Sequence, residues 1–462
     1  MGEDLLFAGL GLVMREAALF AGTGFLLLGT SDLLVDFIWI ARTLRRRFTI
    51  YRRFERASAA TLKPTDRPGR LALFVPAWKE SGVIGEMLRS ALATFRHDDY
   101  RIYVGAYPND PATIDAVRRV TDARVRLVIG PKPGPTTKAD CLNRIWEAML
   151  GDEATEAKPV KAIVLHDAED VVHSAELILF DSLIDRFALV QLPVLPLIDP
   201  GSRWIAGHYA DEFAESHAKE MVVREALGAG LPSAGVGCAF ARDALAEIAA
   251  AGGGAPFDAD SLTEDYELGL RLRAMGRRAA FVRLPGERGR PVVMTREYFP
   301  CTIKAAVSQK ARWMTGIALS GWDRLGWTGG VAERWMRLRD RQSVLAALFL
   351  FAAYVALLLW AVLSLRHIFF GAPPEPVAPA LAALLAANFV LLGWRVAMRF
   401  GFVTHFYGWR EGLRSIPRVV IGNIIAMLAA RRAVMRYLGT RRSGRVDWDK
   451  TVHFFPAALP AE

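Results

Sequence analysis

Three carboxylates in a short loop have the chemistry of a ligand site. Asp167, Glu169 and Asp170 directly follow an apolar run at residues 162–165. The carboxyl end of a strand is where open α/β sheets bind their ligands. Carboxylate oxygens are also the ligands that Mg²⁺ and Mn²⁺ prefer. The loop therefore fits a divalent-metal site, although acidic residues that close a strand are common in ordinary loops as well.

A second pair of carboxylates, Glu264 and Asp265, follows Thr263. Threonine is a good N-cap, and carboxylates in a first helical turn suit the positive end of the helix dipole. A capped surface helix therefore explains the pair. The acidic loop at residues 167–170 favours a second interpretation, in which both groups of carboxylates belong to one site.

Gln309, Arg312 and Trp313 offer hydrogen bonds, a fixed cation and a stacking plane. Sugars present apolar CH faces, so tryptophan suits a sugar subsite, and arginine suits a diphosphate. The same residues fit a basic amphipathic helix that lies on lipid with Trp313 as its anchor. Both interpretations hold if the site lies at the membrane surface.

Two glycine- or proline-rich segments are further candidates for ligand binding. Lys138 ends a turn-rich stretch before a helix predicted over residues 139–150, where backbone amides and a lysine can cradle a diphosphate. Gly235 and Gly237 lie in residues 233–240, where a backbone without side chains can approach a ligand closely. An ordinary loop and a flexible turn explain these two segments equally simply.

The elements that must position these residues alternate between strands and helices. Strands are predicted at residues 71–76, 102–107, 125–129, 162–165 and 189–194, and helices at residues 83–95, 111–121, 139–150 and 242–251. This alternation predicts an α/β fold with a mostly parallel sheet.

Apolar segments flank this predicted domain. Three segments are each long enough to cross a bilayer: residues 17–40, 343–365 and 377–394. Residues 416–428 are short and flanked by arginines, which favours an interfacial or re-entrant helix over a full span. Arginines follow the first span, precede the second and follow the third, so the positive-inside rule predicts an external amino terminus and a cytosolic carboxyl terminus. The acidic start of the chain argues against a cleaved signal peptide.

Composition supports a membrane protein with a catalytic domain. Hydrophobic residues make up 52% of the 462 residues, and the formal net charge is +10. The arginines cluster beside apolar segments, so lipid headgroups are expected partners, and no nucleic-acid-binding module is recognisable. Three well-separated cysteines favour a reduced, cytosolic setting.

Three segments together resemble the motifs of the family 2 glycosyltransferases. They are Asp-Ala-Glu-Asp at residues 167–170, Thr-Glu-Asp at 263–265 and Gln-x-x-Arg-Trp at 309–313. The likeness is greatest to the membrane-embedded branch that includes cellulose and hyaluronan synthases. Residues 295–300 and 448–453 look like the bacteriophage adsorption protein B group within it. The resemblance implies a GT-A fold, an α/β transferase domain with flanking transmembrane and interfacial helices.

The resemblance also implies roles for the candidate residues. Asp265 would be the general base of an inverting transfer, with Glu264 beside it counted as catalytic. Mg²⁺ or Mn²⁺ would be held in the acidic loop, where Glu169 stands at the second place of the usual Asp-x-Asp pattern. Whether Glu169 or Asp170 binds the metal beside Asp167 therefore stays open. The donor would be bound by Pro76, Ala77, Glu80, Asp110, Lys138 and Asp167, and the acceptor by Gly235, Gly237, Gln309, Arg312 and Trp313.

Two features depart from the family pattern. Relatives carry Asp-Asp-Gly after the second strand, where this chain has Ala-Tyr-Pro-Asn-Asp at residues 106–110, so Asp110 matches only with a shift in register. The chain also lacks a Phe-x-Val-Thr-x-Lys gating segment. Sugar transfer is therefore better supported than repeated chain extension with secretion.

The sequence predicts five regions: a transmembrane helix at residues 1–41, a basic linker at 42–70, the transferase domain at 71–335, two transmembrane helices at 336–400 and an interfacial helix with a cytosolic tail at 401–462. We expect transfer from a nucleotide sugar, UDP-linked by resemblance, to a lipid-linked or growing glycan. The expected location is the cytosolic face of a bacterial inner membrane, with an outer-membrane or periplasmic export partner possible. The alternative is a non-catalytic membrane component of an envelope export or receptor assembly.

Overall fold

A seven-stranded sheet forms the core of the catalytic domain. The computed structural model describes residues 2–443 and 453–456. The strands lie in the order β3-β2-β1-β4-β6-β5-β7. They are β1 (Arg70–Pro76), β2 (Tyr100–Ala106), β3 (Val125–Ile129), β4 (Val160–Leu165), β5 (Leu189–Gln191), β6 (Cys238–Ala241) and β7 (Ala279–Phe281). Only β6 among these named strands runs against its neighbours, so the predicted mostly parallel α/β sheet is confirmed.

Helices cover this sheet and connect its strands. They are α2 (Ile84–Thr94), α3 (Pro111–Arg118), α4 (Lys138–Glu156), α5 (Glu176–Leu183), α8 (Arg242–Ala251) and α9 (Glu264–Ala274). The strands β1 and β4 are almost wholly buried, which is why both read as continuous apolar runs. The predicted bounds of β3 and α8 are those of the structure, whereas β5 ends at Gln191, three residues earlier than predicted.

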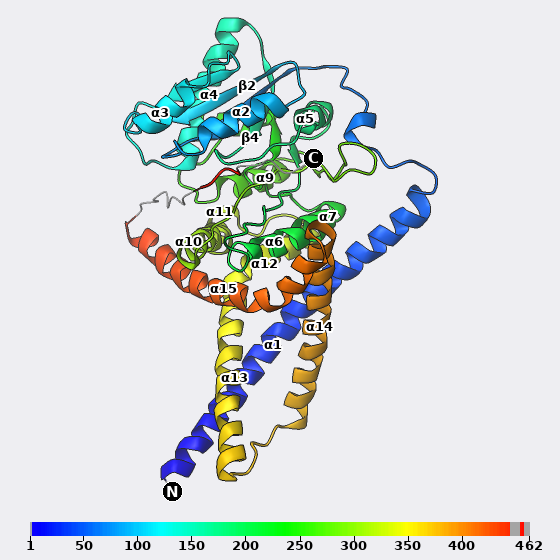
Figure 1. Ribbon diagram of the computed structural model, residues 1–462, viewed down its shortest axis with the longest axis vertical. Coiled ribbons are helices and arrows are strands. Elements are labelled where there is room, and N and C mark those ends of the chain that lie inside the picture. Colours follow the sequence, from blue (N-terminus) through cyan, green and yellow to red (C-terminus); the bar gives the residue numbers. More distant parts are fainter. Residues whose placement is uncertain (1, 444–452, 457–462) are drawn as a thin grey trace.

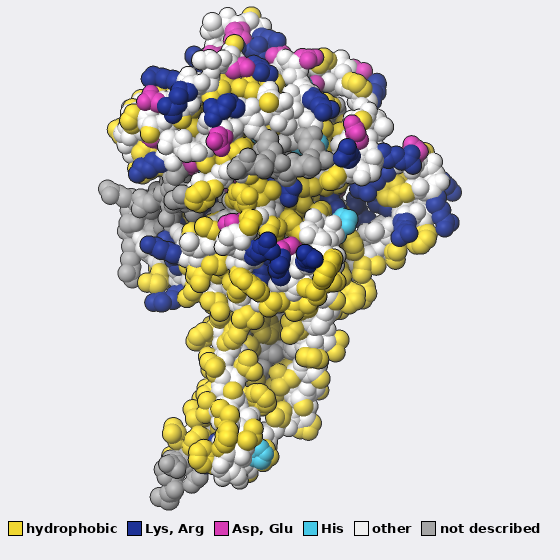
Figure 2. All heavy atoms as spheres, in the orientation of Figure 1, with side chains coloured by type: hydrophobic (Ala, Val, Ile, Leu, Met, Phe, Trp, Pro, Cys, Tyr) yellow, Lys and Arg dark blue, Asp and Glu magenta, His cyan; other side chains and the backbone are white. Residues whose placement is uncertain are grey.

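Four long helices make up the apolar half of the molecule (Figures 1 and 2). They are α1 (Gly2–Arg45), α13 (Ser343–Phe370), α14 (Pro379–Tyr407) and α15 (Trp409–Ser443), and the short π-helix η1 (Arg46–Ile50) continues α1. Segments of all four are long and apolar enough to cross a membrane. Figure 1 shows α1, α13 and α14 extending away from the sheet domain, whereas α15 lies across their ends next to that domain.

The prediction of a short helix at residues 416–428 is wrong about its length. The helix α15 has 35 residues and includes Pro417. Arg418, which marked one end of the apolar run, is fully buried and pairs with Asp211 at 2.7 Å and Glu411 at 2.9 Å. Its charge is therefore neutralised within the protein and does not end the helix. The crosswise position of α15 is consistent with an interfacial helix, which stays a prediction.

A layer of shorter helices joins the membrane helices to the sheet. It comprises α6 (Gly207–Glu215), η3 (Ser216–Glu220), α7 (Met221–Ala226), α10 (Ile303–Trp313), η4 (Met314–Ser320), α11 (Gly321–Leu325) and α12 (Val331–Arg341). Lys219 in this layer bonds Asp36 of α1 at 2.5 Å and Glu215 at 2.7 Å, and all three side chains are buried. Asp36 therefore faces protein, as a charged residue in such a helix must unless it meets water.

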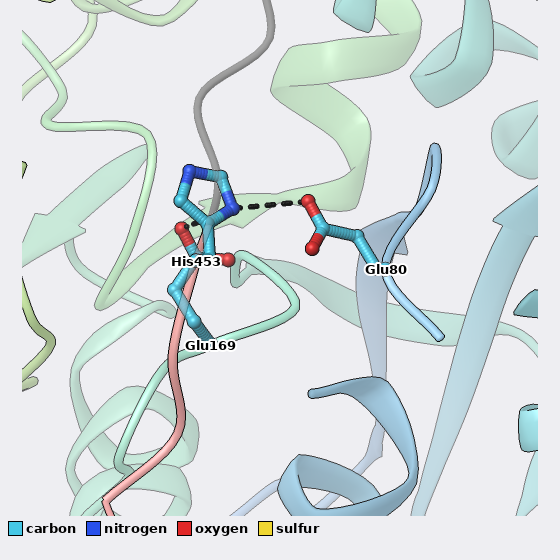
Figure 3. A group of neighbouring side chains, drawn as sticks. All are labelled: Glu80, Glu169 and His453. Atoms are coloured by element: carbon cyan, nitrogen blue, oxygen red, sulfur yellow. Dashed lines mark hydrogen bonds and ion pairs between the residues drawn. The ribbon is translucent and has the colours of Figure 1, made fainter. Parts of the chain in front are cut away.

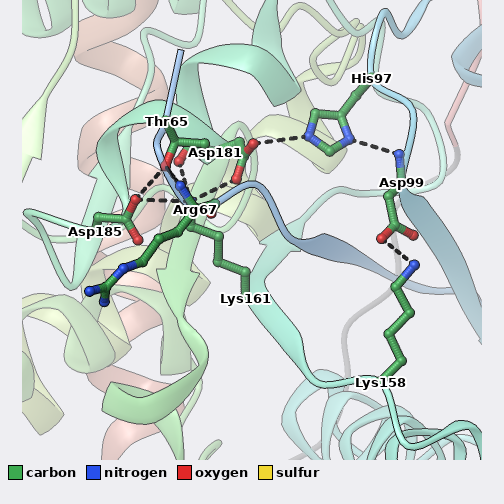
Figure 4. A network of polar contacts seen from close by, with 8 residues as sticks. All are labelled: Thr65, Arg67, His97, Asp99, Lys158, Lys161, Asp181 and Asp185. Carbon is green, nitrogen blue, oxygen red and sulfur yellow. Dashed lines mark hydrogen bonds and ion pairs between the residues drawn. The ribbon is translucent and has the colours of Figure 1, made fainter. Parts of the chain in front are cut away.

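The linker before β1 is fixed to the sheet domain by a polar network (Figure 4). The ammonium group of Lys161 on β4 donates to Asp181 at 2.8 Å, to Asp185 at 3.0 Å and to the carbonyl oxygen of Arg67 at 2.8 Å. Thr65 of the linker donates to Asp185 at 2.7 Å. The network lies at the amino end of β4, away from the acidic loop at its carboxyl end.

Candidate active site

One large cavity joins the carboxyl edge of the sheet to the membrane helices. Its volume is about 1340 Å³. The predicted site residues that line it are Pro76, Glu80, Lys138, Asp167, Glu169, Asp265, Gln309, Arg312 and Trp313. The far end is lined by apolar side chains of α1, α13 and α14. The structure thus brings together predicted site residues from five segments that are distant in sequence.

The acidic loop after β4 is held by a buried histidine. The two ring nitrogens of His166 contact Asp170 and Glu176, each at 2.7 Å. Burial alone would lower the pKa of His166, but these two carboxylates raise it to about 10. Asp170 also accepts the backbone N–H of Asp167 at 3.1 Å. Asp170 therefore shapes the loop from within through its Oδ2 atom, and its role as a metal ligand stays a prediction.

Glu169 points the other way, toward Glu80 and His453 (Figure 3). The Nδ1 atom of His453 lies 3.0 Å from Glu80 and 3.1 Å from Glu169. Burial disfavours a charged imidazole, yet the carboxylates of Glu169 and Glu80 raise the pKa of His453 to about 10. One ligand atom from each of the three residues lies within 4.8 Å of the others. Two carboxylates and an imidazole are a donor set that suits Mn²⁺, so these residues fit a divalent metal.

Sequence reasoning missed His453 as a site residue. The segment at residues 448–453 was noted only as a family likeness, and residues 448–452 lie outside the described part of the chain. Glu297, which also lines the cavity, comes from the other such segment, at residues 295–300. Its carboxyl is buried near Asp170 and Glu169, and burial followed by these charges raises its pKa. For both His453 and Glu297, the available signal was that their segments resemble the family, but the sequence suggested no role for either residue.

Lys138 and Asp167 form an ion pair of 2.6 Å in the cavity. Burial would raise the pKa of Asp167, but the charge of Lys138 outweighs it and lowers that pKa. Lys138 is the first residue of α4, whose N-cap, Thr137, accepts the backbone N–H of Asp140 at 3.2 Å. A cation and the free amides of a helix start therefore face the acidic loop, as a diphosphate site requires.

Glu264 and Asp265 form the first turn of α9, and Asp265 lines the cavity. Burial raises the pKa of Asp265, although the positive charge of Lys138 acts in the opposite direction. Burial and the charge of Asp265 raise the pKa of Glu264 to about 7. The prediction that Thr263 is the N-cap residue of this helix is confirmed for its position. Its hydroxyl, however, is buried without a hydrogen-bond partner in the described structure.

The two glycines of the 233–240 segment are required by packing. Gly235 has φ +76°, and a Cβ there would lie 2.3 Å from the Oδ2 atom of Asp265. Gly237 has φ +56°, and a Cβ there would lie 2.2 Å from the hydroxyl of Thr295. Gly235 therefore makes room for the carboxylate of Asp265, a reason for its presence that the sequence did not indicate.

Gln309, Arg312 and Trp313 lie on α10. The Oε1 atom of Gln309 is buried and accepts no hydrogen bond within residues 2–443 and 453–456. Trp313 packs edge-on against Tyr209, with ring centroids 6.0 Å apart. Elsewhere α10 contacts α15 through the buried Ala311. The helix therefore meets the cavity on one side and α15 on another, and its contact with lipid stays a prediction.

Asp110 and Ala77 are not among the residues that line the cavity. The carboxylate of Asp110 accepts the backbone N–H of Lys79 at 2.6 Å and that of Thr113 at 3.4 Å. It thus caps α3 and fixes the loop after β1. The N–H of Ala77 donates to the carbonyl oxygen of Gly105 at 2.8 Å, which continues the pairing of β1 with β2.

Comparison with known proteins agrees with this geometry. Residues 68–316 match the sequence model of the family described as glycosyltransferase like family 2. The chain is 39% identical over 455 residues to bacteriophage adsorption protein B of Escherichia coli strain K12, and equally to bacteriophage N4 adsorption protein B of Escherichia coli O157:H7. Each alignment covers 93% of this chain and 60% of the relative, so the chain spans about 60% of the length of these curated relatives.

A solved structure shares the fold. The mannosyltransferase PcManGT from Pyrobaculum calidifontis, in complex with GDP-Man and Mn²⁺, matches 92% of this chain and 99% of its own, with a TM-score of 0.55. The two sequences are 17% identical, so this similarity concerns the fold alone.

Proposed function

The chain belongs to glycosyltransferase like family 2, and we propose that it transfers a sugar, with inversion, from a nucleotide sugar to a lipid-linked acceptor at a membrane surface. One observation carries the proposal. A single cavity of about 1340 Å³ contains Lys138, Asp167 and Asp265 at one end and apolar residues of three candidate membrane helices at the other. Donor chemistry and a membrane-embedded acceptor can therefore meet in one space.

The donor end suits a nucleoside diphosphate. Lys138 and the first amides of α4 would bind the diphosphate oxygens. Glu169, Glu80 and His453, with Asp167 nearby, would hold Mn²⁺ or Mg²⁺, which stabilises the negative charge of the leaving diphosphate when bound. The Mn²⁺ and GDP-Man of the structurally similar mannosyltransferase are consistent with this assignment.

Asp265 is placed to act as the general base. The acceptor hydroxyl attacks the anomeric carbon, the bond from that carbon to the diphosphate oxygen breaks, and the hydroxyl proton passes to Asp265. Attack on the face opposite the leaving group inverts the anomeric centre. Arg312, which has no ion pair or hydrogen bond within the described residues, offers a cation to the diphosphate, and Trp313 offers an apolar face to the sugar.

The acceptor end suits a lipid. The cavity continues between α1, α13 and α14, where Phe25, Leu357, Leu385 and Phe389 line it. Side chains of this kind bind an acyl or isoprenoid chain more favourably than a hydrated glycan. The expected location is the cytosolic face of a bacterial inner membrane, because the arginines after η1 would then lie inside.

The names of the relatives suggest a second candidate function. Both curated relatives are named for bacteriophage adsorption, which would suit a component of an envelope receptor or export assembly. The two functions are compatible if the transferred sugar becomes part of a surface glycan. A purely non-catalytic role would not require Lys138, Asp167 and Asp265 to face one cavity.

The test uses purified full-length chain and a panel of nucleotide sugars, with release of free nucleoside diphosphate as the readout. We expect at least one donor to be turned over, with Mn²⁺ or Mg²⁺ increasing the rate and a chelator abolishing the increase. No turnover of any donor by folded protein, with or without lipid extract, would favour the non-catalytic alternative.

A further inference from the structure

A second large cavity lies beside the catalytic one and is strongly basic. Its volume is about 900 Å³. Of the described residues, seven arginines and one carboxylate, Glu55, line it. Three of the arginines are in residues 52–56 and four are in residues 283–296. Figure 2 shows Lys and Arg side chains gathered where the segment after α1 meets the sheet domain. The charged side chains that line this cavity are therefore predominantly cationic.

Within residues 2–443 and 453–456, Arg283 and Arg296 have no carboxylate partner. Among the described residues, Arg296 makes no side-chain hydrogen bond or ion pair, and its Nε atom is buried. Arg283 donates from one terminal nitrogen to the carbonyl oxygen of Ala218 at 3.0 Å, but its buried Nε atom also lacks a partner. The carboxylate of Glu55 is exposed and already pairs with Arg288 at 3.3 Å. The protein therefore leaves the inner charge of this pocket unbalanced.

Burial without a counter-ion has a cost that a bound anion would offset. Burial lowers the pKa of Arg296, and burial with the nearby charge of Arg56 lowers that of Arg283 to about 10. Both guanidinium groups are thus destabilised in their charged form as the chain stands. An anion bound to either group would reverse this effect there, because charge-assisted hydrogen bonds are strong in a partly dehydrated site.

The walls of the pocket indicate what else the anion carries. The planar guanidinium group matches the oxygen geometry of phosphate in a bidentate fork. Phe54, Phe406 and Tyr407 add aromatic surface, and the volume is far larger than one inorganic ion needs and lies in the range of organic-ligand pockets. We propose that this cavity, here called the arginine pocket, binds a phosphate-bearing organic anion, with Arg283 and Arg296 among its cationic contacts.

The arginine pocket is separate from the donor site but shares a wall with it. Val171 and Arg296 are paired by two backbone hydrogen bonds of 2.7 and 3.1 Å, and both residues line the arginine pocket. Glu169 and Glu297, close to them in sequence, line the catalytic cavity. A ligand on Arg296 would therefore lie behind the acidic loop and not in the space for the donor.

Two sources can supply such a ligand, and the experiment distinguishes them. The end of α14 contributes His405, Phe406 and Tyr407 to the pocket, so the headgroup of an anionic membrane lipid is one source. A soluble phosphate compound is the other. The full-length chain, purified in detergent with a chelator present to suppress metal-dependent binding, is titrated with inorganic pyrophosphate by calorimetry. The same chain in phosphatidylcholine nanodiscs is titrated with a fluorescent phosphatidylglycerol.

The test variant is the double substitution Arg283→Gln and Arg296→Gln. The matched control is Arg118→Gln with Arg119→Gln, which removes the same charge from two exposed arginines at the end of α3. We expect the test variant to lose affinity about tenfold or more for one of the two probes, since hydrogen bonds to charged groups are lost. The control should bind like the unchanged chain. If the test variant loses affinity for pyrophosphate alone, the ligand is a soluble phosphate compound. If it loses affinity for the lipid alone, the ligand is a lipid headgroup.

Equal affinities of the test and control variants for both probes would overturn the proposal. So would absence of binding of either probe to the unchanged chain. Should the double Gln variant fail to fold, Arg296→Lys keeps the charge and removes the bidentate fork. It should still weaken binding severalfold, and a folded Arg296→Lys protein with unchanged affinity would likewise count against the arginine pocket.

Discussion

Replacing Gly235 by alanine would test whether the position of Asp265 matters for transfer. A Cβ at residue 235 would lie 2.3 Å from Oδ2, 3.1 Å from Cγ and 3.3 Å from Cβ of Asp265. The Oδ2 atom would have to move away, and Cγ and Cβ would each have to give by a few tenths of an ångström. Restoring an ordinary separation requires a displacement of about 1 Å, and a misplacement of that size can cost roughly 10²-fold in rate.

A second effect of the substitution must be separated from this one. Gly235 has φ +76°, and alanine in that region costs about 1–2 kcal/mol. Gly228 provides the matched control, since it has φ +69° and no heavy atom would lie within 4 Å of its Cβ. Gly228→Ala should therefore lose a similar amount of stability and keep its turnover.

The assays are steady-state transfer at saturating donor and thermal unfolding. We expect Gly235→Ala to lose about 10²-fold in turnover with little change in donor affinity. If both alanine variants are equally destabilised and equally active, the close approach of Gly235 to Asp265 has no part in catalysis. A loss of activity in Gly228→Ala as large as in Gly235→Ala would show that backbone strain alone explains the effect.

Three further predictions concern the metal, the pH dependence and the membrane topology. Calorimetry should show weaker Mn²⁺-dependent binding of nucleoside diphosphate in each of three variants: Glu169→Gln, His453→Gln and Asp167→Ala. Unchanged affinity in all three variants would place the metal elsewhere. The charge of Lys138 lowers the pKa of Asp265, so Lys138→Met should move the acid limb of the kcat–pH profile, measured at saturating donor, to higher pH. An unmoved acid limb would show that Lys138 does not influence the protonation of the general base. An amino-terminal tag should be accessible from the periplasm and a carboxyl-terminal tag should not; exposure of the carboxyl-terminal tag would mean that α15 spans the membrane.

The sequence was most informative where burial is uniform. The strands β1 and β4 are buried on both faces, so their apolar runs stand out and the acidic residues that follow them mark the sheet edge. The elements from β1 to β4 could therefore be placed within a few residues. The family resemblance then assigned Glu80 and Asp167 to one donor site, and both line the catalytic cavity.

Side-chain direction in loops could not be predicted. Glu169 and Asp170 are adjacent in sequence, and only the buried His166 determines that Asp170 points inward while Glu169 faces Glu80. The contact between His453 and Glu80 joins residues 373 positions apart, which no local pattern encodes. The length of α15 was hidden for a similar reason, since the partners that neutralise Arg418 include the distant Asp211.

The most direct test of the proposed mechanism is Asp265→Asn. Asparagine keeps the size of the side chain and most of its hydrogen bonding but cannot take the acceptor's proton. General-base catalysis contributes roughly 10²–10⁴-fold, so turnover should fall by about that factor while donor affinity, measured by calorimetry with nucleoside diphosphate and Mn²⁺, stays the same. A folded Asp265→Asn protein that transfers sugar to its acceptor at a near-normal rate would contradict the assignment of Asp265 as the base.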